Sequence, residues 1–133
     1  MDMSLFTSFE GRVGRQSFWL GLIALIVAEW IVFFIITMLL GGGSMVTAVD
    51  PNNPEAAVAA VSAMMVPIGI VSLIFLWPAL AVQVKRWHDR GKSGWWVLIA
   101  FVPIIGGIWA LVECGFLRGT PGPNQYGPDP AAG

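Results

Sequence analysis

The chain has 133 residues, of which 56% are hydrophobic and only 11% are charged, and its formal net charge is −1. Soluble globular domains contain about 25% charged residues, and nucleic-acid-binding domains need a broad basic face, so the composition excludes both classes. The one cysteine, Cys114, excludes an internal disulfide. We therefore expect a single, small, all-α domain that is integral to a membrane.

Three apolar segments are expected to form transmembrane helices, over about residues 17–40, 62–84 and 95–117. About 20 apolar residues of helix cross a hydrocarbon core about 30 Å thick. The first segment is longer than the apolar region of a signal peptide, and no small-residue cleavage site follows it. We expect it to stay in place as an anchor, with Ser17 as its N-cap.

The ends of the chain differ in character from this membrane domain, residues 17–117. Residues 1–16 combine aromatic side chains with arginines, which is typical of a segment at the lipid headgroups; a disordered tail that only carries orienting charges is the other interpretation. Residues 118–133 are rich in glycine and proline. Because proline lacks a backbone donor, we expect an irregular tail there.

Two carboxylates fall inside the apolar segments. Glu29 lies near the middle of the first one, where a charged side chain costs about 2.5–3.5 kcal/mol on insertion scales. It either contacts a proton or a ligand, or it is a neutral side chain bonded to a neighbouring helix. Glu113 is expected near the outer interface, in reach of water.

Prolines and glycines mark the boundaries of the second and third segments. Asn53, Pro54 and Glu55 are typical of a helix start, and Pro67 predicts a kink or break in the helix that follows. The run Pro103–Gly107 lies at the centre of the third segment. We favour a kinked spanning helix there. The alternative is a re-entrant hairpin that turns at this run, which requires that its non-helical backbone is buried by other parts of the protein.

The distribution of lysine and arginine predicts the orientation in the membrane. Arginines precede the first helix, four cations lie between the second and third segments, and residues 41–53 have none. The positive-inside rule places the N-terminus and residues 85–96 in the cytoplasm, and three spans would put the tail outside. A re-entrant third segment would bring the tail inside.

The stretch KRWHDRGKSGWW, residues 85–96, is the densest cluster of polar chemistry in the chain. A phosphate-binding loop is excluded because Arg86 stands where its first glycine belongs. A zinc site and a catalytic triad are excluded because His88 is the only histidine, and its neighbour Asp89 cannot easily take the triad geometry. We predict no catalytic residue, no metal site and no cofactor, and hence no enzyme.

Binding is the better interpretation of this stretch, since its cations suit phosphates and its tryptophans suit the acyl–headgroup boundary. Orientation in the membrane is the alternative that needs no ligand. We expect anionic lipid or a partner protein as the ligand, with a homo-oligomer as a further option and no nucleic acid. Gly91 and Gly94 predict a tight turn. The candidate binding residues are Arg12, Arg15, Arg86, Trp87, His88, Asp89, Arg90, Lys92, Trp95 and Trp96.

Three stretches together resemble the small bacterial inner-membrane family called domain of unknown function 805. They are FEGRVGRQSFW at 9–19, RWHDRGKSGWW at 86–96 and GTPGPNQYGPDP at 119–130. The resemblance implies a multi-pass inner-membrane protein without an established activity. It also implies that the tail is not idle, and singles out Asn124, Tyr126 and Asp129. A docked tail would need to share a side with the arginine and tryptophan cluster.

We therefore expect a non-enzymatic, multi-pass protein of the bacterial inner membrane that works through a basic and aromatic cytoplasmic face. A small transporter or ligand-binding membrane protein that uses Glu29, and less so Glu113, is the alternative.

Overall fold

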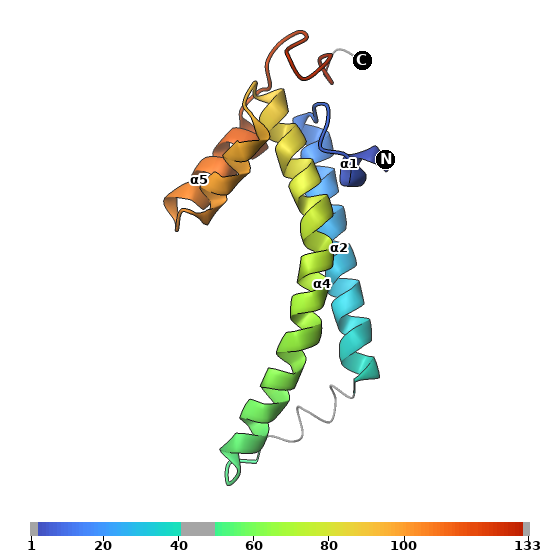
Figure 1. The fold of residues 1–133 in the computed structure, drawn as a ribbon, viewed down its shortest axis with the longest axis vertical. Helices are drawn as coiled ribbons and strands as arrows, with labels where there is room; N and C mark the ends of the chain where they lie inside the picture. Colours follow the sequence, from blue (N-terminus) through green and yellow to red (C-terminus); the bar gives the residue numbers. More distant parts are fainter. Residues whose placement is uncertain (1–2, 41–49, 132–133) are drawn as a thin grey trace. The chain divides into compact units, whose positions relative to one another are not determined.

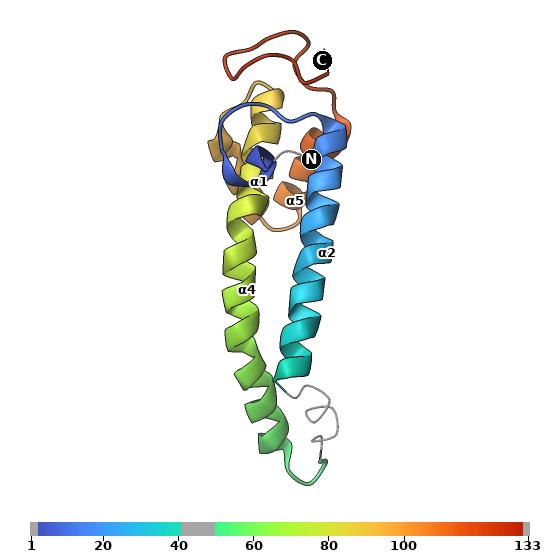
Figure 2. The ribbon, with the colours of Figure 1, turned by 90° about the vertical axis from the view of Figure 1, so that its right-hand side faces the viewer.

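The computed structural model describes residues 3–40 and 50–131, and in these ranges the elements are all helical. The connection expected over residues 41–53 lies mostly outside the described residues. Two compact units are distinguished along the chain, one of residues 1–25 and 77–133 and one of residues 26–76. The elements, drawn in Figures 1 and 2, are α1 (Ser4–Thr7), α2 (Arg15–Leu39), α4 (Pro54–Asp89), η1 (Gly94–Phe101), α5 (Ile105–Ala110) and η2 (Leu111–Phe116).

The helices α2 and α4 are both long and apolar enough to cross a membrane. α4 begins at Pro54 as predicted, and the side chain of Asn53 accepts the N–H of Ala56 at 3.3 Å. α2 begins at Arg15, so the expected N-cap at Ser17 is wrong. The N–H of Phe18 bonds instead to the carbonyl of Gly14 at 2.9 Å, which starts the helix three residues earlier.

Of the kink or break predicted at Pro67, a break does not occur, because α4 continues through Pro67 and Pro78 for 36 residues. Each proline removes one backbone hydrogen bond, and a long apolar helix tolerates that loss where its remaining ladder is intact. At about 1.5 Å per residue α4 is about 54 Å long. The Ala-rich residues at its start are therefore an extension of the same helix.

The third apolar segment is a hairpin and not a continuous helix, which corrects the favoured expectation of a third span. The 3-10 helix η1 ends at Phe101, and α5 starts at Ile105 and is followed by η2. Between them Ile104 has a φ of 65° and a ψ of −65°, and the N–H of Ile105 bonds to the carbonyl of Pro103 at 2.7 Å. This three-residue γ-turn reverses the chain.

Glycines let the two arms of the hairpin and α4 approach each other closely. A Cβ at Gly106 would overlap the carbonyl of Ile99 on the opposite arm, and a Cβ at Gly94 would stand 2.7 Å from Val84 of α4. The run Pro103–Gly107, at the centre of the third apolar segment, thus allows the chain to reverse its direction. No other residue type fits at position 106, where the clash is with backbone, and at position 94 a Cβ would force the side chain of Val84 to shift.

The core of the first unit lies where α1, α2, the end of α4 and the hairpin meet. Trp87 and Cys114 are fully buried there, and partly buried side chains from α2 and the hairpin pack against them. Outside this cluster the helices expose apolar side chains to their surroundings, as a lipid-facing protein does. The buried core residues are Leu5, Val13, Phe18, Val82, Trp87 and Cys114.

Candidate functional site: a polar cap built from three motifs

The C-terminal end of α4 turns sharply through a glycine and a serine. The N–H of Lys92 bonds to the carbonyl of Trp87, and the N–H of Gly91 to that of His88, each at 2.9 Å. With a φ of 77° at Gly91, this is a Schellman motif, which satisfies the last carbonyls of a helix. Ser93 then caps η1 by accepting the N–H of Trp95 at 3.2 Å. The tight turn predicted from Gly91 is confirmed.

Asp89, at the end of α4, holds two arginines from different parts of the chain. Its Oδ1 lies 3.0 Å from Nη2 of Arg12, and its Oδ2 pairs with Nη1 of Arg86. The Arg12 and Arg86 side chains are 1% and 0% exposed, and that of Asp89 is 5% exposed. Two buried guanidinium groups therefore share one buried carboxylate, and their remaining donors need other partners.

Arg12 uses its remaining donors on the tail. Its Nη1 donates to the carbonyls of Gly122 at 2.7 Å and Gly127 at 3.2 Å, and its Nη2 donates to that of Thr120 at 2.6 Å. Guanidinium groups are suited to this because they carry five donors in a fixed fork. The N-terminal motif and the tail are thus joined through one side chain.

Four consecutive carbonyls at the end of η2 are capped by side chains from elsewhere in the first unit. Arg86 donates from Nε to the carbonyl of Cys114 at 2.6 Å and from Nη2 to that of Leu117 at 2.5 Å. Trp19 donates to the carbonyl of Gly115 at 2.9 Å, and Arg15 to that of Phe116 at 3.0 Å. A helix leaves its last carbonyls without hydrogen-bond partners. Here the guanidinium groups and an indole N–H donate to these carbonyls.

The tail packs on the end of α4 (Figures 1 and 2). The ring of Tyr126 stacks on that of His88 with centroids 3.9 Å apart and planes 2° apart. Asn124 donates from its side chain to the carbonyl of His88 at 2.9 Å. Thr120 donates its N–H to the carbonyl of Asp89 at 2.7 Å. The tail therefore lies on the same side as residues 85–96, and the expectation of opposite sides is wrong.

Two further contacts explain the tail motif. A Cβ at Gly119 would overlap the carboxylate of Asp89, so only glycine fits there. The carboxylate of Asp129 accepts the N–H groups of Gly122 and Ala131, each at 2.9 Å. These hydrogen bonds to its charged form hold the pKa of Asp129 below its ordinary value.

The rim of this site is more exposed and carries two further cations, Lys92 and Arg90. Lys92 and Arg90 both contact Glu113, at 2.6 Å and 3.3 Å, with the two cationic side chains 29% and 23% exposed. Glu113 is therefore ion-paired and not in open contact with water near an outer interface. Trp96 stacks on Trp87 with centroids 5.8 Å apart.

We call the whole arrangement the polar cap. Its members are Arg12, Arg15, Trp19, residues 85–93, Glu113 and residues 119–129. It unites most of the predicted binding residues with the tail motif, whereas Trp95 is 80% exposed beside it. Glu29 belongs to the second unit, where it accepts a hydrogen bond from Ser72 at 3.3 Å.

Sequence reasoning missed several contributors. Trp19 is not among the predicted binding residues, although its indole N–H donates to the carbonyl of Gly115. Gly115 approaches the Trp19 ring so closely that a Cβ would stand 2.7 Å from it. Lys85, which was counted as an orienting charge, is buried and donates to the carbonyl of Ser4. Thr120 and Ser72 had no signal in the sequence alone.

Comparison with known proteins identifies the family. A model of the family described as "Protein of unknown function (DUF805)" matches residues 6–128. The chain is 32% identical over 130 residues to inner membrane protein YhaH of Escherichia coli strain K12, covering 94% of this chain and 88% of YhaH. It is 29% identical over 146 residues to the uncharacterized protein YiiR of the same strain, covering 92% and 85% of the two chains.

A shorter alignment of 57 residues is 46% identical to inner membrane protein YhaI of that strain, and covers 42% of this chain and 47% of YhaI. No solved structure matches the chain. The family match spans the first two motifs and the tail motif up to residue 128, and the two long apolar helices agree with relatives of the inner membrane. The chain therefore belongs to the DUF805 family of bacterial inner-membrane proteins.

Proposed function

We propose that this protein is a non-enzymatic membrane protein whose polar cap anchors a re-entrant hairpin in the cytoplasmic leaflet and contacts anionic phospholipid headgroups there. The observation that supports this proposal is that the hairpin exposes apolar side chains and has cations at its base. Trp95, Phe101 and Ile104 of the hairpin are 80%, 78% and 81% exposed. Side chains of this kind favour a hydrocarbon surrounding over water.

The length of the hairpin suits one leaflet. Its first arm, η1, has eight residues, about 16 Å at the rise of a 3-10 helix. The returning arm of α5 and η2 has six residues in each part, at most about 18 Å. Since the hydrocarbon core is about 30 Å thick, the hairpin would enter about half of it and return.

The tip of the hairpin is compatible with hydrocarbon because its backbone is largely satisfied. Pro103 has no N–H to satisfy, and the N–H groups of Val102, Ile105 and Gly106 bond to carbonyls of the turn and of η1. An unpaired backbone group in lipid costs several kcal/mol. The γ-turn therefore supports an embedded tip.

The cations at the base would lie at the headgroups. All seven Lys and Arg residues belong to the first unit, but the side chains of Arg12, Lys85 and Arg86 are buried and bonded inside the protein. Arg15 and Arg118 are exposed, and Lys92 and Arg90 are partly exposed. Each cation near an anionic surface contributes about 1 kcal/mol of attraction. We therefore assign lipid contact to these four residues.

The cluster of cations also favours a cytoplasmic location for the whole cap. With residues 85–96 and the docked tail together, both the N- and C-terminal segments would be cytoplasmic. A Gln125→Cys variant in a C114A background tests this with a membrane-impermeant maleimide. Labelling only after the membrane is permeabilised supports the proposal, and labelling of intact spheroplasts contradicts it.

Lipid selection is tested with the purified protein in nanodiscs that contain equal amounts of phosphatidylglycerol and phosphatidylcholine. Native mass spectrometry counts the lipids that remain bound after release. We expect the wild type to retain mainly phosphatidylglycerol. The R15Q/R118Q variant should lose up to about 2 kcal/mol of this preference, about 30-fold in the ratio.

The R15K/R118K variant, which keeps both charges, and E10Q, at an exposed carboxylate, are the matched controls. Both should retain the preference of the wild type. An unchanged lipid ratio in R15Q/R118Q would contradict the assignment of lipid contact to these cations.

A further inference from the structure

Glu29 in the second unit is an ionisable group without a cationic partner in its surroundings. Residues 26–76 contain no Lys, Arg or His. Its hydrogen bond from the hydroxyl of Ser72, 3.3 Å long, joins α2 to α4. A hydroxyl is neutral, so it orients the carboxylate but does not supply an opposite charge.

An ionised carboxylate in an apolar helix is costly unless its charge is balanced. No side chain of the second unit can balance it, and none of the ion pairs among the described residues includes Glu29, so the counter-charge is expected from outside the chain. A proton is one source and a bound cation is the other. The surroundings of the carboxylate decide which cations would fit.

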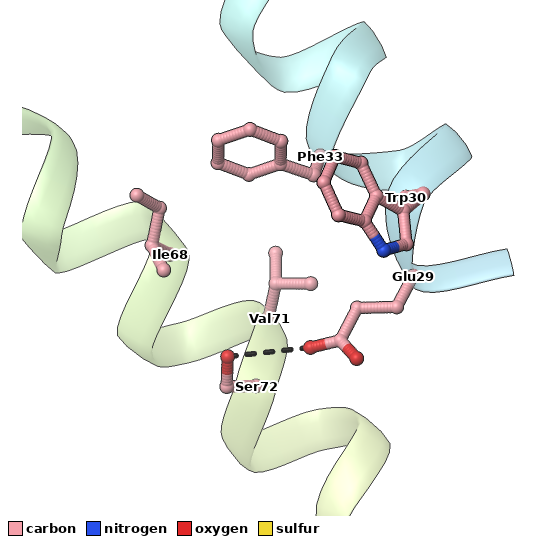
Figure 3. Close-up of a pocket in the computed structure, with 6 residues that line it drawn as sticks. All are labelled: Glu29, Trp30, Phe33, Ile68, Val71 and Ser72. Atoms are coloured by element: carbon pink, nitrogen blue, oxygen red, sulfur yellow. Dashed lines mark hydrogen bonds between the residues drawn. The ribbon is translucent and has the colours of Figure 1, made fainter. Parts of the chain in front are cut away.

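Glu29 opens onto a pocket of about 360 Å³ between α2 and α4. Figure 3 shows the carboxylate reaching from α2 toward Ser72, with the rings of Trp30 and Phe33 on the same helix. Ile68 and Val71 of α4 complete the lining. The pocket thus offers one negative charge among apolar and aromatic walls.

From this geometry we infer a binding site for a lipophilic monovalent organic cation, such as a quaternary ammonium or phosphonium ion with apolar substituents. The carboxylate would balance the charge, the indole face would attract the cation, and the aliphatic side chains would bury its substituents. The ligand would reach the pocket through the hydrocarbon, because Trp30, which lines the pocket, is 69% exposed. This inference is independent of the lipid contacts at the polar cap.

Other occupants fit the site less well. A metal cation such as Ca²⁺ requires six to eight oxygen ligands, and the lining supplies one carboxylate and one hydroxyl. A second copy packed on this face would bring another Glu29 and no cation from residues 26–76, so like charges would oppose the contact. The complementary ligand is therefore a separate cation with apolar groups.

The experiment compares two ions of the same shape and opposite charge on the full chain in neutral nanodiscs. Equilibrium dialysis with radiolabelled tetraphenylphosphonium should give saturable binding of one ion per chain. Tetraphenylborate should show only the partition into lipid that empty nanodiscs show. Equal saturable binding of both ions would overturn the inference, because lipophilicity alone would then explain it.

The variants separate the role of the carboxylate from a structural role. E29Q should weaken tetraphenylphosphonium binding at least about 30-fold, as for loss of one partner of a desolvated charge pair. E29D keeps the charge and should retain saturable binding even if E29Q folds poorly. E55Q removes an exposed carboxylate of the second unit that does not line the pocket, and should bind like the wild type.

Binding by E29Q that equals the wild type would overturn the inference. The inference would also be overturned if E29Q lost binding and at the same time changed its oligomeric state, measured by light scattering, while E55Q did not. That result would assign the pocket to a second copy of the chain. Loss of binding in E29Q alone, with an unchanged oligomeric state, supports the cation site.

Discussion

Replacement of Asp89 by asparagine is expected to loosen the whole polar cap. This carboxylate is the shared counter-charge of Arg12 and Arg86, whose side chains are 1% and 0% exposed. Asparagine has nearly the same shape as aspartate and removes only the negative charge. Two buried guanidinium groups would then remain without a counter-charge. Removing one partner from a buried ion pair costs about 3–5 kcal/mol.

Cys114 provides a native reporter of this change. It is the one cysteine of the chain, it is 0% exposed, and its carbonyl accepts the Nε donor of Arg86 at 2.6 Å. Its thiol can react with a maleimide only when the surrounding structure opens. If opening and closing are fast, a loss of 3–5 kcal/mol would raise the labelling rate about 150- to 5,000-fold.

Two variants control for effects unrelated to the buried charge. E10Q removes an exposed carboxylate and should change the labelling of Cys114 by less than about twofold, since exposed charges contribute little. D89E retains the charge and should fall between the wild type and D89N. Circular dichroism checks that α2 and α4 remain helical. Labelling of D89N no faster than that of E10Q would refute the argument that Asp89 holds the cap closed.

Three further outcomes concern the tail, measured as its protection from limited proteolysis. Gly119→Ala should release the tail because its Cβ would overlap the carboxylate at the end of α4, whereas Gly107→Ala, with nothing within 4 Å of its Cβ, should not. Tyr126→Ala loses the stacking on His88, about 0.5–1.5 kcal/mol or up to about tenfold in protection, and Tyr126→Phe keeps it. Asp129 has a lowered pKa, so its contribution to the protection of the tail is complete above its ordinary pKa of 3.8 and is lost as the pH falls through the lowered pKa. In D129N, the protection of the tail should no longer change with pH in this range.

The sequence predicted the features that depend on local chemistry. The two long helices follow from apolar runs, and the start of α4 follows from Asn53 and Pro54. The turn at Gly91 follows from a glycine between a charged helix end and Ser93. In each case the signal and the structure that it produces lie within a few residues of each other.

The roles of the arginines could not be predicted in this way. An arginine beside an apolar run has the same pattern whether it faces a lipid phosphate or a carbonyl of its own chain. Arg12 contacts partners 77 to 115 residues away in sequence, and no local pattern encodes such pairs. The reversal at the hairpin could not be predicted for a similar reason, because Pro103 and Gly106 are compatible with the kinked helix that we favoured as well as with a reversal.

The polar cap and the hairpin explain each other physically. A short helix that ends inside or at the edge of a membrane leaves carbonyls that neither lipid nor a continuing helix can satisfy. Here the carbonyls of residues 114–117 receive donors from Arg86, Trp19 and Arg15. Cations at this end also interact favourably with the negative end of the helix dipole.

This arrangement creates a second requirement. Because Arg86 is itself buried, its charge needs Asp89, and Asp89 in turn pairs with Arg12, whose remaining donors are used by carbonyls of the tail. The three motifs are thus linked in one chain of dependence that runs from the end of η2 to the tail. A hairpin held in this way needs the N-terminal motif and the tail on its own side of the membrane, which is why we expect a loss at any one motif to be felt at the other two.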